Sequence, residues 1–117
     1  MSDSITLVAA GEHQSHGASV PLDCSAYSTL RLDLACTVVG GVPALPSAVD
    51  VRLETSSDGS SWRLLREFLS LATVEIQRAI VTNHDTYVRA TWLENTQEGQ
   101  PLSQWSLTGE ALPEAAS

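Results

Sequence analysis

Residues 30–38 read Leu30-Arg31-Leu32-Asp33-Leu34-Ala35-Cys36-Thr37-Val38. Leucine, cysteine or valine occupies every even position, and the odd positions between them are polar or small. Successive side chains of a β-strand point to opposite faces of the sheet, so this period of two predicts a strand with one apolar face. It is the longest strand that the sequence predicts, and its apolar face requires a further layer of structure to cover it.

The same alternation recurs from one end of the chain to the other. Val49, Val51 and Leu53 alternate with polar residues, which predicts a strand at 49–54. Further strands are predicted at residues 4–10, 19–23, 61–69, 73–81, 86–93 and 102–110. No segment of about twelve residues shows the 3.6-residue apolar period of an amphipathic helix, so little helix is expected.

We therefore predict an all-β fold. It is an antiparallel two-sheet β-sandwich of about eight strands, jelly-roll-like or Ig-like in strand order, with little or no helix. A flattened barrel is the alternative. The length of 117 residues fits one domain spanning residues 1–117, with short soft ends expected at 1–3 and 111–117.

One predicted strand departs from the alternating pattern. Arg78 falls on the side of the strand that Val74, Ile76 and Ile80 occupy. A β-bulge or a position at the edge of a sheet would turn the arginine outward, so we expect one of these two features there.

The charged side chains exclude several classes of function. The chain has 14 acidic residues against 6 basic ones, a formal net charge of −8, and all 6 basic residues are arginine. Without lysine there is no P-loop lysine, Schiff-base lysine or lysine general base. Nucleic acid and anionic membrane surfaces are not expected as partners, because both repel a strongly acidic protein. Lysine side chains commonly protect the edges of sheets from pairing with other chains. Because this chain has no lysine, we expect its sheet edges to be paired or covered in an assembly.

No motif in the sequence indicates catalysis. It contains neither a G-x-S-x-G nucleophile turn nor a cysteine motif, so we predict a protein that is not an enzyme, with no catalytic residues and no cofactor. His13-x-x-His16 is the nearest approach to a metal motif, but no further ligand clusters beside it, and a surface loop is expected instead. The N-terminus carries no secretory signal, so we expect folding in a cytoplasm, with Cys24 and Cys36 reduced and buried.

Candidate contact residues come from one long loop and from the N-terminal segment. Residues 40–48 carry no charge, although loops normally face water. This loop is predicted either to contact a partner or to fold over the open end of its own sandwich. The candidate interface residues are Val42, Pro43, Leu45, Pro46 and Ile5.

The three tryptophans are predicted mainly to pack in the core. Trp92 and Trp105 are in phase with aliphatic neighbours on their strands, and Trp62 is in phase with Leu64 and Phe68. In the alternative interpretation, Trp62 and Tyr87 form an exposed aromatic platform for a sugar ring.

Three segments resemble small β-sandwich virion proteins of tailed bacteriophages. They are Val51-Arg52-Leu53-Glu54-Thr55-Ser56-Ser57-Asp58-Gly59-Ser60-Ser61-Trp62, Tyr87-Val88-Arg89-Ala90-Thr91-Trp92 and Trp105-Ser106-Leu107-Thr108-Gly109-Glu110-Ala111. The resemblance implies a head decoration (cement) protein, or a neck or tail accessory protein, located in the virion after synthesis in the host bacterial cytoplasm. The implied partners are the major capsid protein or other virion proteins, and a homo-oligomer is expected. Residues 56–62 are also similar to a hairpin of galactose-binding-like and discoidin-like modules, which makes a carbohydrate-binding module the alternative.

Overall fold

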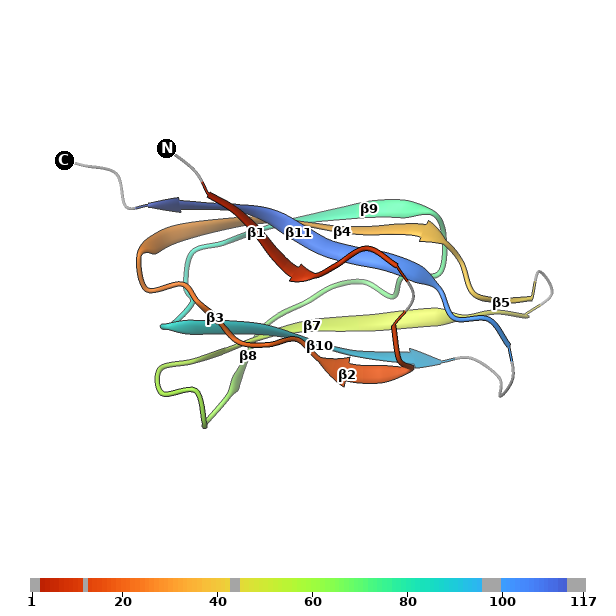
Figure 1. Cartoon of the computed structure of the whole chain (residues 1–117), viewed down its shortest axis with the longest axis horizontal. Coiled ribbons are helices and arrows are strands. Elements are labelled where there is room, and N and C mark those ends of the chain that lie inside the picture. The colour runs from red at the N-terminus through yellow and green to blue at the C-terminus, as the bar shows by residue number, and fades with distance from the viewer. Residues whose placement is uncertain (1–2, 12, 43–44, 96–99, 114–117) are drawn as a thin grey trace.

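A computed structural model describes residues 3–11, 13–42, 45–95 and 100–113. Its strands are β1 (Asp3–Val8), β2 (His16–Ala18), β3 (Leu22–Asp23), β4 (Tyr27–Val38), β5 (Gly41–Val42), β6 (Leu45–Pro46), β7 (Ala48–Ser56), β8 (Arg63–Glu67), β9 (Glu75–Val81), β10 (Tyr87–Asn95) and β11 (Gln104–Pro113). Two sheets lie one above the other as the layers of a sandwich (Figure 1). The described residues form no helix, and so none that is long and apolar enough to cross a membrane.

The strand order is that of a jelly roll. One sheet has the order β1-β11-β4-β9, and the other has the order β2-β10-β7-β8, with β3 also paired to β10. If β2 and β3 count as one interrupted strand, the first strand of the sandwich pairs with the last, the second with the second-last, and so on inward to the adjacent pair β7 and β8. A long antiparallel hairpin rolled into two layers has this nested pairing, which is the double Greek key of jelly rolls. The predicted two-sheet sandwich is confirmed, and its order is the jelly-roll alternative.

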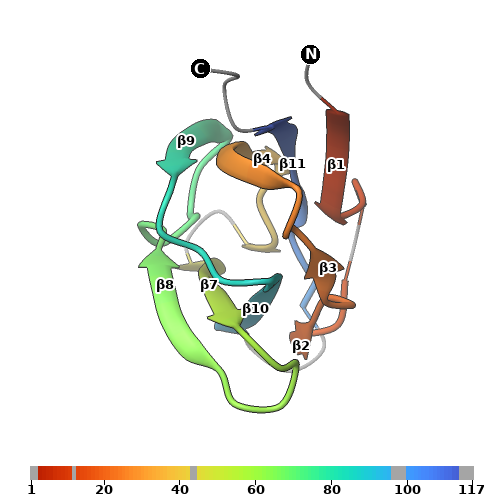
Figure 2. The same ribbon diagram turned by 90° about the vertical axis from the view of Figure 1, so that its left-hand side faces the viewer.

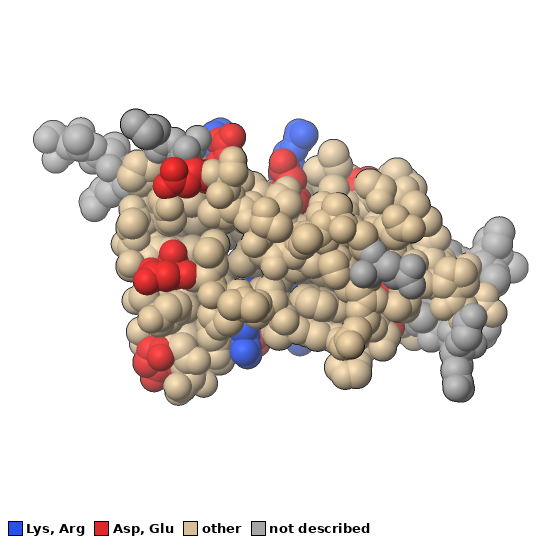
Figure 3. All heavy atoms as spheres, in the orientation of Figure 1, with Lys and Arg blue, Asp and Glu red and all other residues tan. Residues whose placement is uncertain are grey.

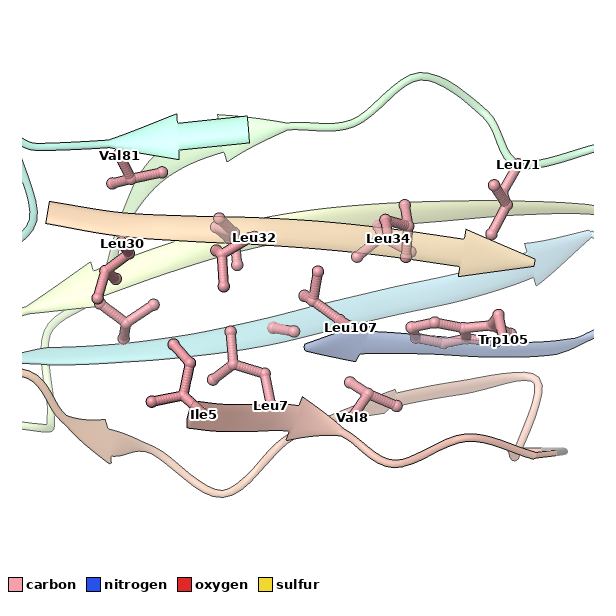
Figure 4. Packing of buried hydrophobic residues seen from close by; sticks show 14 of the residues in the cluster. Ile5, Leu7, Val8, Leu30, Leu32, Leu34, Leu71, Val81, Trp105 and Leu107 are labelled. Atoms are coloured by element: carbon pink, nitrogen blue, oxygen red, sulfur yellow. The ribbon is translucent and has the colours of Figure 1, made fainter. Parts of the chain in front are cut away.

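Strand β4 supplies the centre of the core, as its alternation predicts. Leu30, Leu32, Leu34 and Cys36 are each at most 2% exposed. They pack between the sheets with residues of β1 and β11, including the fully enclosed Trp105 (Figure 4). Burying one leucine of this kind stabilises the fold by roughly 1.5–3 kcal/mol. The end-on view in Figure 2 shows the two sheets as separate layers.

The ends of the described chain belong to the sheet. β1 begins at Asp3, which pairs with Ala111, and Ala111 is completely buried. β11 continues to Pro113. Within the predicted soft ends, Asp3 and residues 111–113 therefore belong to paired strands, because the closing strand pairs with β1 on one side and β4 on the other. The rest of the predicted soft ends lies outside the described residues.

Strand β9 buries the face opposite to the one that its sequence indicates. Its ladder with β4 runs without a register shift from Val81 to Glu75, so there is no bulge at Arg78. The alternative, an edge position, is confirmed, because β9 ends its sheet. Ala79 pairs with the buried Leu32, and directly paired residues share a face, so Ala79 and Val81 point inward. Arg78 therefore points outward together with its apolar neighbours.

Candidate interaction surface

The uncharged loop forms a small hairpin at one end of the sandwich. Gly41 pairs with Pro46 and Val42 with Leu45, which makes the two-stranded ribbon of β5 and β6. Figure 1 places β5 at the end opposite the start of β1. Of the candidate interface residues in this loop, Pro43 lies outside the described residues. The hairpin thus extends the sandwich along its long axis at this end.

A buried polar cluster fixes the base of this hairpin. The Glu94 carboxylate oxygen Oε2 accepts hydrogen bonds from Ser47 Oγ at 2.5 Å and from the Ser103 backbone N–H at 2.8 Å. Ser103 Oγ in turn accepts the Gly40 N–H at 2.8 Å. Ser47, Glu94 and Ser103 are all buried, so these bonds form away from water, where leaving one unmade is costly. The cluster ties both ends of the hairpin to β10 and to the segment before β11.

Sequence reasoning missed this cluster, although a signal for it exists. Glu94 falls in the same phase of its strand as Val88 and Ala90, which are both fully buried. A carboxylate on the inward side of a strand requires hydrogen-bond donors close by. The alternation of residues 86–93 therefore already pointed to an unusual environment for Glu94.

Ile5, the candidate interface residue outside the loop, lies in the core instead. It is 7% exposed and packs with the buried cluster between the sheets (Figure 4). Its neighbour in phase, Leu7, is also buried. The two alternate with exposed residues on β1, so Ile5 faces the second sheet and cannot serve as a surface contact.

An exposed apolar row follows β9. Ile76 and Ile80 are 58% and 65% exposed on the outer side of the sheet, and Val74, in the bend directly before the strand, is 69% exposed. Arg78 lies between the two isoleucines and is paired with Asp33 of β4 at 3.3 Å, so the charge within the row is neutralised locally. A shallow depression of about 370 Å³ lies beside the row over β4, β9 and β11. Figure 3 shows the opposite side of the molecule, where β1 and β2 lie in front, and uncharged residues form most of that face.

His13 belongs to an aromatic cluster. Its ring lies 4.9 Å from the ring of Trp105 and 5.8 Å from that of Trp92, measured between centroids. His16 lies in β2 and is exposed. The part of the chain that the structure describes contains no group of three His, Cys, Asp or Glu side chains suited to a metal ion. His16 is thus exposed as expected but lies in a strand, whereas His13 lies in the connection between β1 and β2 as expected but is partly buried against the two tryptophans.

Both tryptophans of this cluster pack as predicted. Trp105 is 1% exposed, and the half-buried Trp92 packs against the core from β10. The Trp92 indole N–H donates to the Gln14 carbonyl at 3.0 Å. Gly17 packs directly on this ring, since a Cβ there would lie 2.7 Å from the indole. The segment between β1 and β2 therefore crosses from one sheet to the other over Trp92.

Trp62 lies on the outer side of its sheet. The register between β7 and β8 shifts between Leu53 and Glu54, so that Leu65 has no partner on β7. Leu65 packs against the core, whereas Leu64 is 51% exposed. This bulge breaks the phase that the sequence suggested between Trp62 and Phe68, so the prediction of a core position for Trp62 is wrong.

The aromatic platform is partly occupied by a neighbouring side chain. The Arg89 guanidinium lies 4.1 Å above the centre of the Trp62 ring and pairs with Glu54 at 2.8 Å. This cation–π contact covers one face of the indole. Tyr87, on the same side of β10 as Arg89, has its ring beside the turn at Gly59. One face of the predicted sugar platform is therefore filled by the protein itself.

The turn between β7 and β8 is held by Asp58. Its Oδ1 accepts the backbone N–H groups of Ser60 and Ser61 at 2.8 and 2.9 Å and the Ser56 hydroxyl at 2.9 Å. These hydrogen bonds lower the pKa of the Asp58 carboxyl to about 2, and the two backbone N–H groups have the largest effect. Gly59 follows with a φ of +80°, a conformation that glycine adopts without strain. The Asp-Gly pair thus serves the turn, as the hairpin signal predicts.

Both cysteines are free and buried, as expected. Burial raises the pKa of the Cys24 thiol to about 11, and burial is also the main reason why the pKa of Cys36 is raised. Nucleophilic attack requires the thiolate, which these environments disfavour. The cysteines act as small apolar side chains of the core.

Comparisons with known proteins identify no similar protein. No protein-family model matches the chain, and no significant match is found among curated proteins or solved structures.

Proposed function

We propose that this protein is a non-enzymatic structural protein of a virion, a decoration or cement protein on the head of a tailed bacteriophage. The observation that carries the proposal is the combination of a jelly roll with the exposed apolar side chains of Val74, Ile76 and Ile80 along its β9 edge. Soluble monomers rarely expose contiguous apolar surface unless a partner covers it. The resemblance of three segments to phage virion proteins indicates what kind of partner this is.

The hairpin of β5 and β6 is the proposed contact with the capsid. Residues 40–48 carry no charge, and both ends of the loop are fixed by the buried cluster around Glu94. A fixed hairpin loses little conformational entropy on binding, which favours affinity. The long sandwich would then stand on the capsid with this end down.

The chemistry of the remaining polar groups supports an adhesive role. The buried carboxylate of Glu94 is surrounded by two serines and backbone groups, without an imidazole to activate a hydroxyl. The cysteine pKa values are raised rather than lowered. Arg89 occupies one face of Trp62, which leaves the carbohydrate-binding alternative with less support.

Co-sedimentation with phage heads tests the proposal. Heads of the phage that encodes the chain, prepared without it, are mixed with increasing amounts of the purified protein and pelleted. We expect saturable binding at a fixed number of copies per capsid protein. Absence of binding to heads, together with a fluorescence response to a glycan panel, would favour the carbohydrate-binding alternative. Binding to isolated necks or tails but not to heads would assign the protein to those parts.

A further inference from the structure

The four sheet edges of the sandwich differ in how well they are protected. β1 has a register shift between Thr6 and Val8, β2 and β3 have three and two residues, and β8 is bulged and carries three charged side chains in five residues. Short strands, bulges and charges all discourage an edge from pairing with another chain. These three edges are therefore closed to further strands.

The edge of β9 lacks these protections. It has seven residues in regular register with β4, contains neither proline nor glycine, and has an apolar outer row. Arg78 is its only outward charge, and that charge is paired with Asp33. Glu75 carries an inward charge, but it is the first residue of the strand. Its carboxylate oxygen Oε1 accepts a hydrogen bond from the Gln77 amide Nε2 at 3.4 Å. Figure 2 shows β9 at a corner of the sandwich, on the side away from β1.

We propose that β9 pairs with β9 of a second copy of this chain, antiparallel about a two-fold axis at Gln77. In this register Val74, in the bend directly before β9, lies opposite Ile80 of the second copy, and this apolar pair occurs twice because the axis repeats it. Ile76 lies opposite Arg78, which keeps the two arginines apart. The two sheets join into one continuous sheet of eight strands.

Neighbouring registers are less favourable. An axis at Arg78 pairs Ile76 with Ile80, but it also places the two arginines directly opposite each other, and like charges in that position destabilise a sheet. An axis at Ala79 places Ile76 opposite Thr82 and loses the pairing of Val74 with Ile80. Of these three registers, only the axis at Gln77 places apolar residues opposite each other without also facing the two arginines, and this self-complementarity is the reason for assigning a second copy as the occupant.

The interface is small. A strand of seven residues spans roughly 23 Å at about 3.3 Å per residue, so the paired edges bury less than a standard protein–protein interface. We expect a weak dimer in solution that becomes effective when a capsid holds copies side by side. This last step rests on the proposed function, whereas the pairing itself is measured without heads.

Sedimentation equilibrium of the purified protein tests the pairing. Over roughly 10 µM to 1 mM, the mass should rise from one chain toward two. Ile80→Lys places a charge in the interface and should raise the dissociation constant at least about tenfold. Leu93→Lys is the matched control, because Leu93 is 56% exposed on the other sheet, and it should leave the dimer unchanged. A single-chain mass throughout, or equal behaviour of the two variants, would overturn the proposal.

Cysteine crosslinking tests the register. Gln77→Cys places a thiol opposite itself across the axis, so mild oxidation should link the dimer, because facing Cα atoms lie within disulfide range. Arg78→Cys should not link, since Arg78 faces Ile76. The native cysteines are buried and do not compete. Linking through position 78 in place of position 77 would refute this register. A dimer that forms without binding heads would refute the proposed function alone.

Discussion

Single residues show where the fold depends on particular hydrogen bonds, and Glu94 is the strongest case. Its carboxylate accepts from Ser47 and Ser103 in a buried position. Glu94→Ala leaves the buried Ser103 N–H unpaired and leaves the Ser47 hydroxyl only Ser103 Oγ, at 3.0 Å, as a partner, so we expect the free energy of unfolding to fall by about 1–3 kcal/mol in urea titrations. Glu94→Gln keeps an acceptor oxygen and should cost less.

The exposed Glu67 provides the control for Glu94. It pairs with Arg52 at 3.4 Å, and both side chains are more than half exposed. Glu67→Ala should change the unfolding free energy by less than about 1 kcal/mol. If the two alanine variants were equally stable, the buried cluster would not contribute to holding the hairpin.

The carboxyl of Asp58 makes stability depend on pH. Its pKa is about 2 in the folded protein against an ordinary value of 3.8, so the folded state binds this proton less readily than the unfolded state does. The contribution is fully present above the ordinary pKa and is lost as pH falls through the folded one. Asp58→Asn should therefore flatten the stability profile between about pH 4 and pH 2, as measured by thermal unfolding. An unchanged acid profile in this variant would contradict the assignment.

At the scale of elements, most strands follow from the alternation of their side chains, and the departures have identifiable causes. Pairing with β4 decides which face of β9 is buried, because Ala79 lies opposite the buried Leu32. The isoleucines of β9 suggested the opposite face. A bulge against β7 resets the phase of β8 at Leu65. In both strands the pairing with a neighbouring strand determines which side chains face inward, and this pairing cannot be read from the sequence of one strand alone.

Three short strands had no signal in the alternation. β2 consists of His16, Gly17 and Ala18, and it forms because Trp92 and the β10 backbone lie beside it. β5 and β6 have two residues each and form inside the uncharged loop that the sequence did single out. Composition identified the loop as a candidate contact, but the buried cluster that holds it depends on three segments distant in sequence.

The hairpin carries its own prediction about binding. The double change Val42→Ser and Leu45→Ser alters the loop without removing Gly40, Ser47 or Glu94 from the cluster at its base. We expect binding to heads to weaken at least about tenfold in co-sedimentation, while the urea midpoint and the dimer mass stay as in the parent protein. The same change at Val20, which is 85% exposed away from the hairpin, is the control. Undiminished binding by the double variant would exclude the hairpin as the contact.

At the scale of the whole molecule, the two proposed surfaces would divide one adhesive task. The hairpin at the end of the sandwich is the proposed contact with the capsid, and the β9 edge along its side is the proposed contact with a second copy. Symmetry on a head would repeat each contact many times, so two weak interfaces give strong attachment through avidity. The low content of charge, 17% of residues against roughly 25% in typical soluble domains, is consistent with a surface that is partly covered in use.

Electron cryo-microscopy of heads reconstituted with the purified protein is the most direct test of this account. It predicts density for the jelly roll at symmetric positions on the capsid, with the β5–β6 hairpin toward the capsid and β9 edges of neighbouring copies side by side. Heads that carry no added density at saturating protein would contradict the central claim that this is an adhesive structural protein of the virion.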